Sequence, residues 1–239
     1  LKVPKMPAGA TGGTGHEILE GIRFIKNNSL FSFLIGMTFF NSFFGMAYVV
    51  LMPVFAEDIL GQGPEAYGAL LSAGGIGALI TTMWLSSITN VRRKGMLLIG
   101  GAVMFGLSIA AFGLTSDIIG SYILALGIMF ISGVFNSVYM ISVMSALQVM
   151  VPDRMRARVM GFFGMTWSMM PLGGMQAGAI ASFIGVPAAV AVGGLAVGAF
   201  ALGPAMVNRR IRNLGTLLQR FEHASPVRSS IHEAPITGG

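Results

Sequence analysis

The stretch VPDRMRARVM, from Val151 to Met160, places one carboxylate and three guanidinium groups within ten residues. Such groups form charge-assisted hydrogen bonds with each other or with neighbouring helix ends. No other charged residue occurs from Ile118 to Pro152 or from Val159 to Asn208. Two interpretations compete: the charges fix the orientation of a membrane protein, or they form a latch that holds one conformation.

The composition is that of a membrane protein. The chain is 54% hydrophobic and 10% charged, whereas soluble domains are roughly 25% charged. Its 34 glycines suit close helix packing in lipid. There is no cysteine, and the three histidines lie in the polar ends of the chain. We therefore expect neither a metal site nor a cofactor, and the spans hold no nucleophile–base set or carboxylate pair that would indicate an enzyme.

Apolar runs and the breakers between them predict an all-α protein with six membrane-spanning helices, because a crossing needs about 20 apolar residues. The spans are about 30–56, 66–89, 95–115, 118–150, 157–183 and 186–207. Residues 1–15 are predicted to be a cytoplasmic linker and residues 16–29 an amphipathic lead-in to the membrane domain, 30–207. Residues 208–239 form a basic tail that we expect to be disordered.

The basic residues define an orientation. All 15 lysines and arginines lie before the first span, between the second and third, between the fourth and fifth, or after the sixth. The other loops carry only acidic residues or no charge. The positive-inside rule then predicts that both termini are cytoplasmic. The net charge of +6 is thereby explained without a nucleic-acid partner.

Longer motifs resemble a known family. The segment VPDRMRARVMGFFGMTWSMMPLGGMQAGAIASFIG is similar to the penultimate helix region of the major facilitator superfamily, and most similar to the bacterial branch with enterobactin exporters and macrolide efflux proteins. EILEGIRFIKNNSLF resembles that branch's lead-in to its seventh helix, and NVRRKGMLLIGG resembles the end of its basic loop between the eighth and ninth helices. The usual acidic residue and Asp-Arg pair of that loop are absent, since Ile88 and Thr89 stand near those places.

The resemblance implies the C-terminal half of a twelve-helix transporter that works by alternating access in the plasma or inner membrane. Its expected partners are the lipid bilayer, an N-terminal six-helix half and a small-molecule substrate. The resemblance alone implies efflux, and charge-free cavity walls favour a lipophilic or amphipathic solute. The alternative is a non-transporting membrane module that binds or regulates a partner.

Neutral polar residues on shared helix faces are the candidates for the substrate cavity. Asn41 and Tyr48 share one face, as do Asn136 and Tyr139. Trp167 and Gln176 can both face a cavity if Pro171 kinks their helix. The candidates are therefore Asn41, Tyr48, Asn136, Tyr139, Trp167 and Gln176. Hydrogen bonding between helices is the competing role for the asparagines and the glutamine. The third and sixth spans, which are poor in polar residues, are expected to face lipid.

The latch hypothesis concerns the basic loops. Its candidate residues are Arg92, Arg93, Asp153, Arg154 and Arg158. If these charges only set the topology, their geometry is irrelevant; if they form a latch, the planar guanidinium is required.

Overall fold

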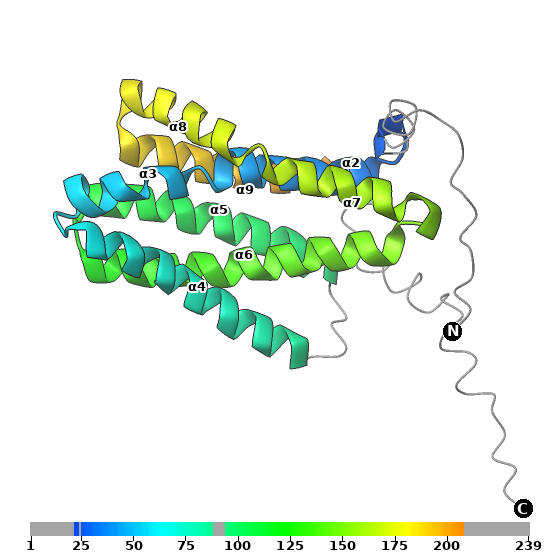
Figure 1. The fold of residues 1–239 in the computed structure, drawn as a ribbon, viewed down its shortest axis with the longest axis horizontal. Helices are drawn as coiled ribbons and strands as arrows, with labels where there is room; N and C mark the ends of the chain where they lie inside the picture. Colours follow the sequence, from blue (N-terminus) through cyan, green and yellow to red (C-terminus); the bar gives the residue numbers. More distant parts are fainter. Residues whose placement is uncertain (1–21, 24, 88–93, 208–239) are drawn as a thin grey trace, which may run out of the picture.

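The computed structural model describes residues 22–23, 25–87 and 94–207, apart from the side chains of Lys94, Asp153, Arg154 and residues 204–207. Every regular element in these ranges is helical (Figure 1). The elements are α2 (Ser29–Phe40), the π-helical turn η1 (Asn41–Gly45), α3 (Tyr48–Val54), the π-helical turn η2 (Phe55–Ile59), α4 (Pro64–Ser87), α5 (Lys94–Ile118), α6 (Tyr122–Met150), α7 (Asp153–Trp167), α8 (Met170–Ile184) and α9 (Val186–Val207).

Five stretches of the described residues are long and apolar enough to cross a membrane. They are Ser29–Ile59, Pro64–Ser87, Gly95–Ile118, Tyr122–Met150 and Val186–Gly203. The span predicted over 157–183 is instead two shorter helices, α7 and α8, with a break at Ser168 and Met169. Six spans were predicted, whereas the described residues hold five helices that are long and apolar enough to cross a membrane, and the predicted fifth span is divided into α7 and α8.

The break before α8 has a local cause. Pro171 lies in the first turn of α8 and has no backbone N–H to donate to the carbonyl of Trp167. The preceding turn tightens, because the Ser168 amide donates to the Met165 carbonyl at 3.1 Å and the Met169 amide donates to that of Thr166 at 3.2 Å. These bonds span three residues rather than four, which ends the helix.

The first span is also interrupted. In η1 the Met46 amide donates to the Asn41 carbonyl at 2.8 Å, and in η2 the Leu60 amide donates to the Phe55 carbonyl at 2.9 Å. These five-residue bonds widen the helix locally, as π-bulges do. The chain bends at Met46 and Ala47 between η1 and α3. The helices α2 and α3 are therefore two segments of one crossing.

Glycines set the distances between the long helices. Gly106 of α5 crosses α9 at Gly194 and Gly198, where an added Cβ would overlap backbone. Gly133 of α6 meets the backbone of Gly74 on α4 in the same manner. Such crossings allow the backbones to approach closely where lipid supplies no hydrophobic force.

The lipid exposure expected of the third and sixth spans stays a prediction. The most apolar part of α5 is 56% buried against the rest of the described chain, whereas that of α4 is 17% buried. Helix α5 packs on both α6 and α9 and exposes one stripe that includes Met104, Leu107 and Leu114. The most exposed span is α4, which lies at the lower edge of the molecule in Figure 1.

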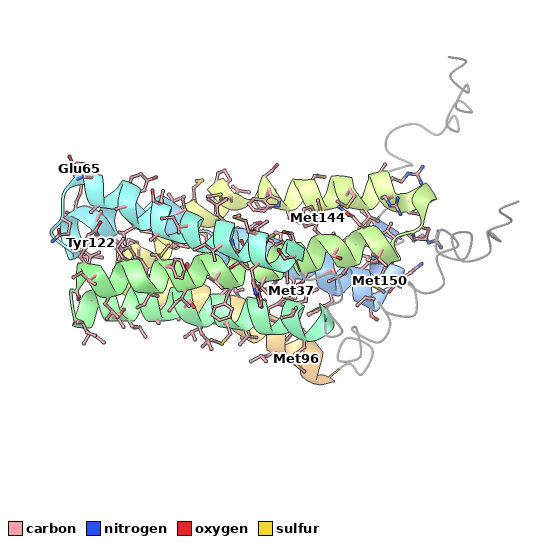
Figure 2. The ribbon with its side chains drawn as sticks, turned by 90° about the horizontal axis from the view of Figure 1, so that it is seen from below. Met37, Glu65, Met96, Tyr122, Met144 and Met150 are labelled. Carbon is pink, nitrogen blue, oxygen red and sulfur yellow. The ribbon has the colours of Figure 1, made fainter. Side chains whose placement is uncertain are left out.

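The two ends of the bundle differ in charge. Figure 2 shows Glu65 and Tyr122 at one end and Met150 at the other. We call the first the acidic end, because its exposed charges are Glu57, Asp58, Glu65 and Asp117. The second is the basic end, with Arg23 and Lys26 in the lead-in before α2 and Arg156 and Arg158 at the start of α7.

Part of the predicted lead-in lies among the described residues. It is helical at 22–23 and 25–27, and Ile25 is buried in the core cluster that includes Val151, Met155 and Val159. The Ser32 hydroxyl donates to the Ile25 carbonyl at 2.7 Å, and the Asn28 side chain accepts from the Leu30 amide at 3.2 Å. These bonds join the lead-in to α2, and Ile25 shares a buried cluster with residues of α7.

Candidate functional site

An open groove of about 550 Å³ lies between α6 and α7. Its lining consists of Met140, Ile141, Met144, Ser145, Gln148, Phe163 and Trp167. Met140, Met144 and Gln148 recur every four residues along α6 and share one face of that helix. Figure 2 shows Met144 on α6, toward the basic half of the bundle.

The lining is apolar and adaptable. Thioether side chains are flexible and polarizable, and they accommodate ligands of varied shape. The rings of Phe163 and Trp167 offer large apolar surfaces that stack on other rings. Ser145, Gln148 and the indole N–H of Trp167 can form hydrogen bonds from side chains, and no lining residue is charged. The volume is in the range of small-molecule sites, about 300–1,000 Å³.

A hydrogen bond joins the basic end of the groove to the start of α7. The Arg156 guanidinium donates from Nη2 to the Gln148 carbonyl at 3.2 Å. Arginine side chains commonly satisfy the last carbonyls of a helix in this manner. Met155 and Val159 are buried, whereas Arg156 is exposed. The charged residues of Val151–Met160 thus lie in the amphipathic start of α7, which carries Arg156 on its outer face.

The latch remains a prediction. Arg92 and Arg93 lie outside the described residues, as do the side chains of Asp153 and Arg154. Arg158 is half-buried, and its Nη1 lies 3.8 Å from the Met155 sulfur.

Of the six predicted cavity residues, Trp167 lines the groove. Tyr139 is fully buried, with its backbone against Gly101 of α5. Its hydroxyl is buried near Thr38 of α2 and has no hydrogen-bond partner among the described residues. Nine residues separate Tyr139 from Gln148, which is about 180° around the helix at 100° per residue. Tyr139 therefore packs on the inner face of α6, opposite the groove.

The remaining candidates are dispersed. Tyr48 is buried in the core cluster near the acidic end, together with Ala177. Asn136 and Gln176 are partly exposed, but the side-chain oxygen of each is buried without a hydrogen-bond partner among the described residues.

Asn41 lies fully buried in η1. Its Oδ1 is 3.0 Å from where a Cβ on Gly45 would be, and Phe105 of α5 and Val197 of α9 approach the same point. Neither amide atom of Asn41 has a partner among the described residues, and the same holds for the Ser42 hydroxyl. Asn41 thus points into the wall formed by α5 and α9.

Most of the groove lining was not predicted from the sequence. Met140, Met144 and Gln148 carry a detectable signal, because they recur at helical spacing on one face of α6. Phe163 offers none, since it lies in a run of apolar residues on α7. In the part of the chain that the structure describes, no three histidine, cysteine or acidic side chains form a metal-binding group.

Comparison with known proteins identifies the family. Residues 12–226 match the family model MFS_3, described as a transmembrane secretion effector. Searches of curated proteins and of solved structures gave no match. The family match covers most of the chain, and the five apolar helices fit a multi-pass membrane protein. The chain therefore belongs to the transmembrane secretion effector family of MFS-type membrane transporters.

Proposed function

We propose that the chain is the C-terminal half of an MFS permease that exports a small lipophilic or amphipathic solute by alternating access. The groove between α6 and α7 is the observation that carries this proposal, because its methionine and aromatic lining suits an apolar ligand of no fixed shape. Family membership favours transport over the alternative of a binding or regulatory module.

The proposed location is the cell membrane, with the basic end in the cytoplasm. All 15 lysines and arginines lie in segments that adjoin this end in the predicted topology, as the positive-inside rule requires. Solute would then enter the groove from the cytoplasm beside Gln148.

The proposed partner is an N-terminal six-helix half. The exposed glycines Gly68 and Gly75 on α4, and Gly161 and Gly164 on α7, have no neighbouring atom within 4 Å of an added Cβ. Small exposed residues let a further membrane helix approach closely. A second half packed on α4 and α7 would cover the open side of the groove and enclose the solute between the halves.

Substitution of Met144 tests the groove as the solute site. Met144→Ala in the complete transporter is expected to raise the KM for efflux three- to tenfold, since lost methyl and methylene contacts cost roughly 1 kcal/mol. The matched control is Met104→Ala on the outer stripe of α5, because the two methionines are similarly exposed, at 36% and 41%. Efflux by everted vesicles, normalised to protein, provides the measurement. Equal effects of the two substitutions would exclude the groove as the solute site. A complete protein that transports no lipophilic solute would favour the alternative of a binding or regulatory module.

A further inference from the structure

Two of the hydrogen-bonding side chains of the groove lie together at its basic end. Ser145 and Gln148 are three residues apart on α6, so they are neighbours on the helix surface. Met140 lies about 12 Å from Gln148 along the same helix, at 1.5 Å per residue, and Trp167 lines the groove from α7. The groove therefore has a polar end at Ser145 and Gln148 and a longer, mainly apolar remainder.

The side chains of Ser145 and Gln148 have no hydrogen-bond partner among the described residues. On the same helix, the hydroxyls of Ser132 and Ser142 donate to the carbonyls of Met129 and Val138 at 2.9 and 2.6 Å. Such bonds to the preceding turn are common for serines within helices. Gln148 is exposed and Ser145 is half-buried, so a ligand in the groove can reach a hydroxyl and a carboxamide that are not already bonded.

A carboxamide is the ligand group that matches the Gln148 side chain most completely. The glutamine presents a carbonyl oxygen that accepts hydrogen bonds and an amino group that donates them. A carboxylate has no donor for that oxygen, and an ammonium has no acceptor for that amino group, whereas a carboxamide has both. The Ser145 hydroxyl can donate to or accept from the same ligand group. The lining around them holds no charged residue, and apolar surroundings strengthen hydrogen bonds.

We propose that Gln148, together with Ser145, determines the specificity of the groove and selects uncharged amphipathic carboxamides, whose apolar or aromatic body lies along the methionines toward Phe163 and Trp167. This inference rests on the proposed function, because it takes the groove as the solute site, and it adds the polar group that the solute carries. A lipophilic molecule of the same shape without that group leaves the Gln148 amide without a partner in the ligand and binds more weakly.

Two probes that differ only in their hydrogen-bond donors test the proposal: 6-(dansylamino)hexanamide and 7-(dansylamino)heptan-2-one. The ketone has a methyl group in place of the amide nitrogen, so it keeps the carbonyl acceptor and loses the terminal N–H donors. The chain has two tryptophans. Trp84 is exposed on α4, and Trp84→Phe leaves Trp167 as the reporter in the groove.

The probes are titrated onto the chain in nanodiscs of phosphatidylcholine, and the saturable quenching of Trp167 emission gives the half-saturating concentration of each probe. Trp167→Phe, which retains Trp84, reports quenching from the lipid phase. The test variant is Gln148→Met, which removes the amide at similar side-chain length and extends the methionine face of α6. It retains the backbone carbonyl of Gln148, which accepts from Arg156 at 3.2 Å.

In Gln148→Met, the half-saturating concentration of the amide is expected to rise at least threefold relative to that of the ketone. A net hydrogen bond contributes roughly two- to tenfold in affinity, and the ratio of the two probes cancels their unequal partition into lipid. The control is Gln62→Met, the same change at an exposed glutamine of the acidic end, which is expected to leave the ratio unchanged.

A smaller rise in Gln148→Met, or an equal rise in Gln62→Met, would overturn the recognition of the carboxamide and leave the groove as a solute site. Saturable quenching of Trp167 by neither probe would remove the groove itself, and with it the observation that carries the proposed function.

Discussion

At the scale of single residues, Asn41 is in an unfavourable environment. Both atoms of its amide are buried and unpaired among the described residues, beside Phe105 and Val197. An unpaired buried polar group costs about 1–3 kcal/mol. The amide therefore destabilises the conformation described here, and a conformation that supplies a partner would be favoured by the same amount.

Asn41→Leu is expected to raise the Tm of the purified protein by several degrees. The substitution removes the unpaired amide and nearly preserves the side-chain volume, and each kcal/mol shifts Tm by about 2–4 °C in a protein of this size. Thr38→Val is the control, because the Thr38 hydroxyl is fully buried on the same helical segment but donates to the Leu34 carbonyl at 3.0 Å. A Tm for Asn41→Leu at or below that of the wild type would mean that the Asn41 side chain has hydrogen-bond partners in the folded protein.

Residue type and spacing selected one residue that lines the groove, Trp167, and the substrate cavity itself stays a prediction. Tyr139, also selected, lies on the face of α6 opposite Gln148. Helical periodicity shows which residues share a face but not which neighbour covers that face. Tyr139 became interior because Gly101 lets α5 approach its backbone, which is a tertiary contact and not a local signal.

At the scale of elements, two interrupted helices pack on each other. Segment α2 contacts α7 on one side of the breaks, and α3 contacts α8 on the other (Figure 1). Gly173 of α8 lies against the backbone of Phe43, and Gly174 lies against the side chain of Val50. Hydropathy predicted both apolar segments as spans, but it did not predict the breaks in their helices. Pro171, for example, is compatible with a kinked helix and with a broken one. The two interrupted helices are therefore packed together on both sides of the breaks.

Gly173→Leu is expected to separate α8 from the first span and to reduce the yield of monodisperse protein severalfold. A side chain at this position overlaps the backbone of Phe43, and no rotamer change can relieve that overlap. Gly178→Leu on the same helix is the control, because no atom lies within 4 Å of its added Cβ. Size-exclusion profiles after detergent extraction give the comparison. Similar profiles for the two variants would show that the contact between α8 and η1 is dispensable.

At the scale of the whole molecule, the charges at the two ends predict the orientation in the membrane. The chain has no native cysteine, so Gln62→Cys at the acidic end and Ala157→Cys at the basic end can each be labelled alone; both residues are exposed. A membrane-impermeant maleimide is expected to label Gln62→Cys in intact cells, and Ala157→Cys only after permeabilisation. The reverse pattern would invert the proposed topology.

The methionines of the groove have a consequence for cells under oxidative stress. Peroxide and hypochlorite convert exposed thioethers to sulfoxides, which are polar and chiral. Met144 is 36% exposed, and Met140 lies one helical turn away in the same lining. Oxidation of this pair would replace an apolar wall with strong hydrogen-bond acceptors and weaken its hold on apolar solutes, until sulfoxide reductases restored the thioethers. In the proposed transporter, export through this groove would therefore depend on the redox state of the cell.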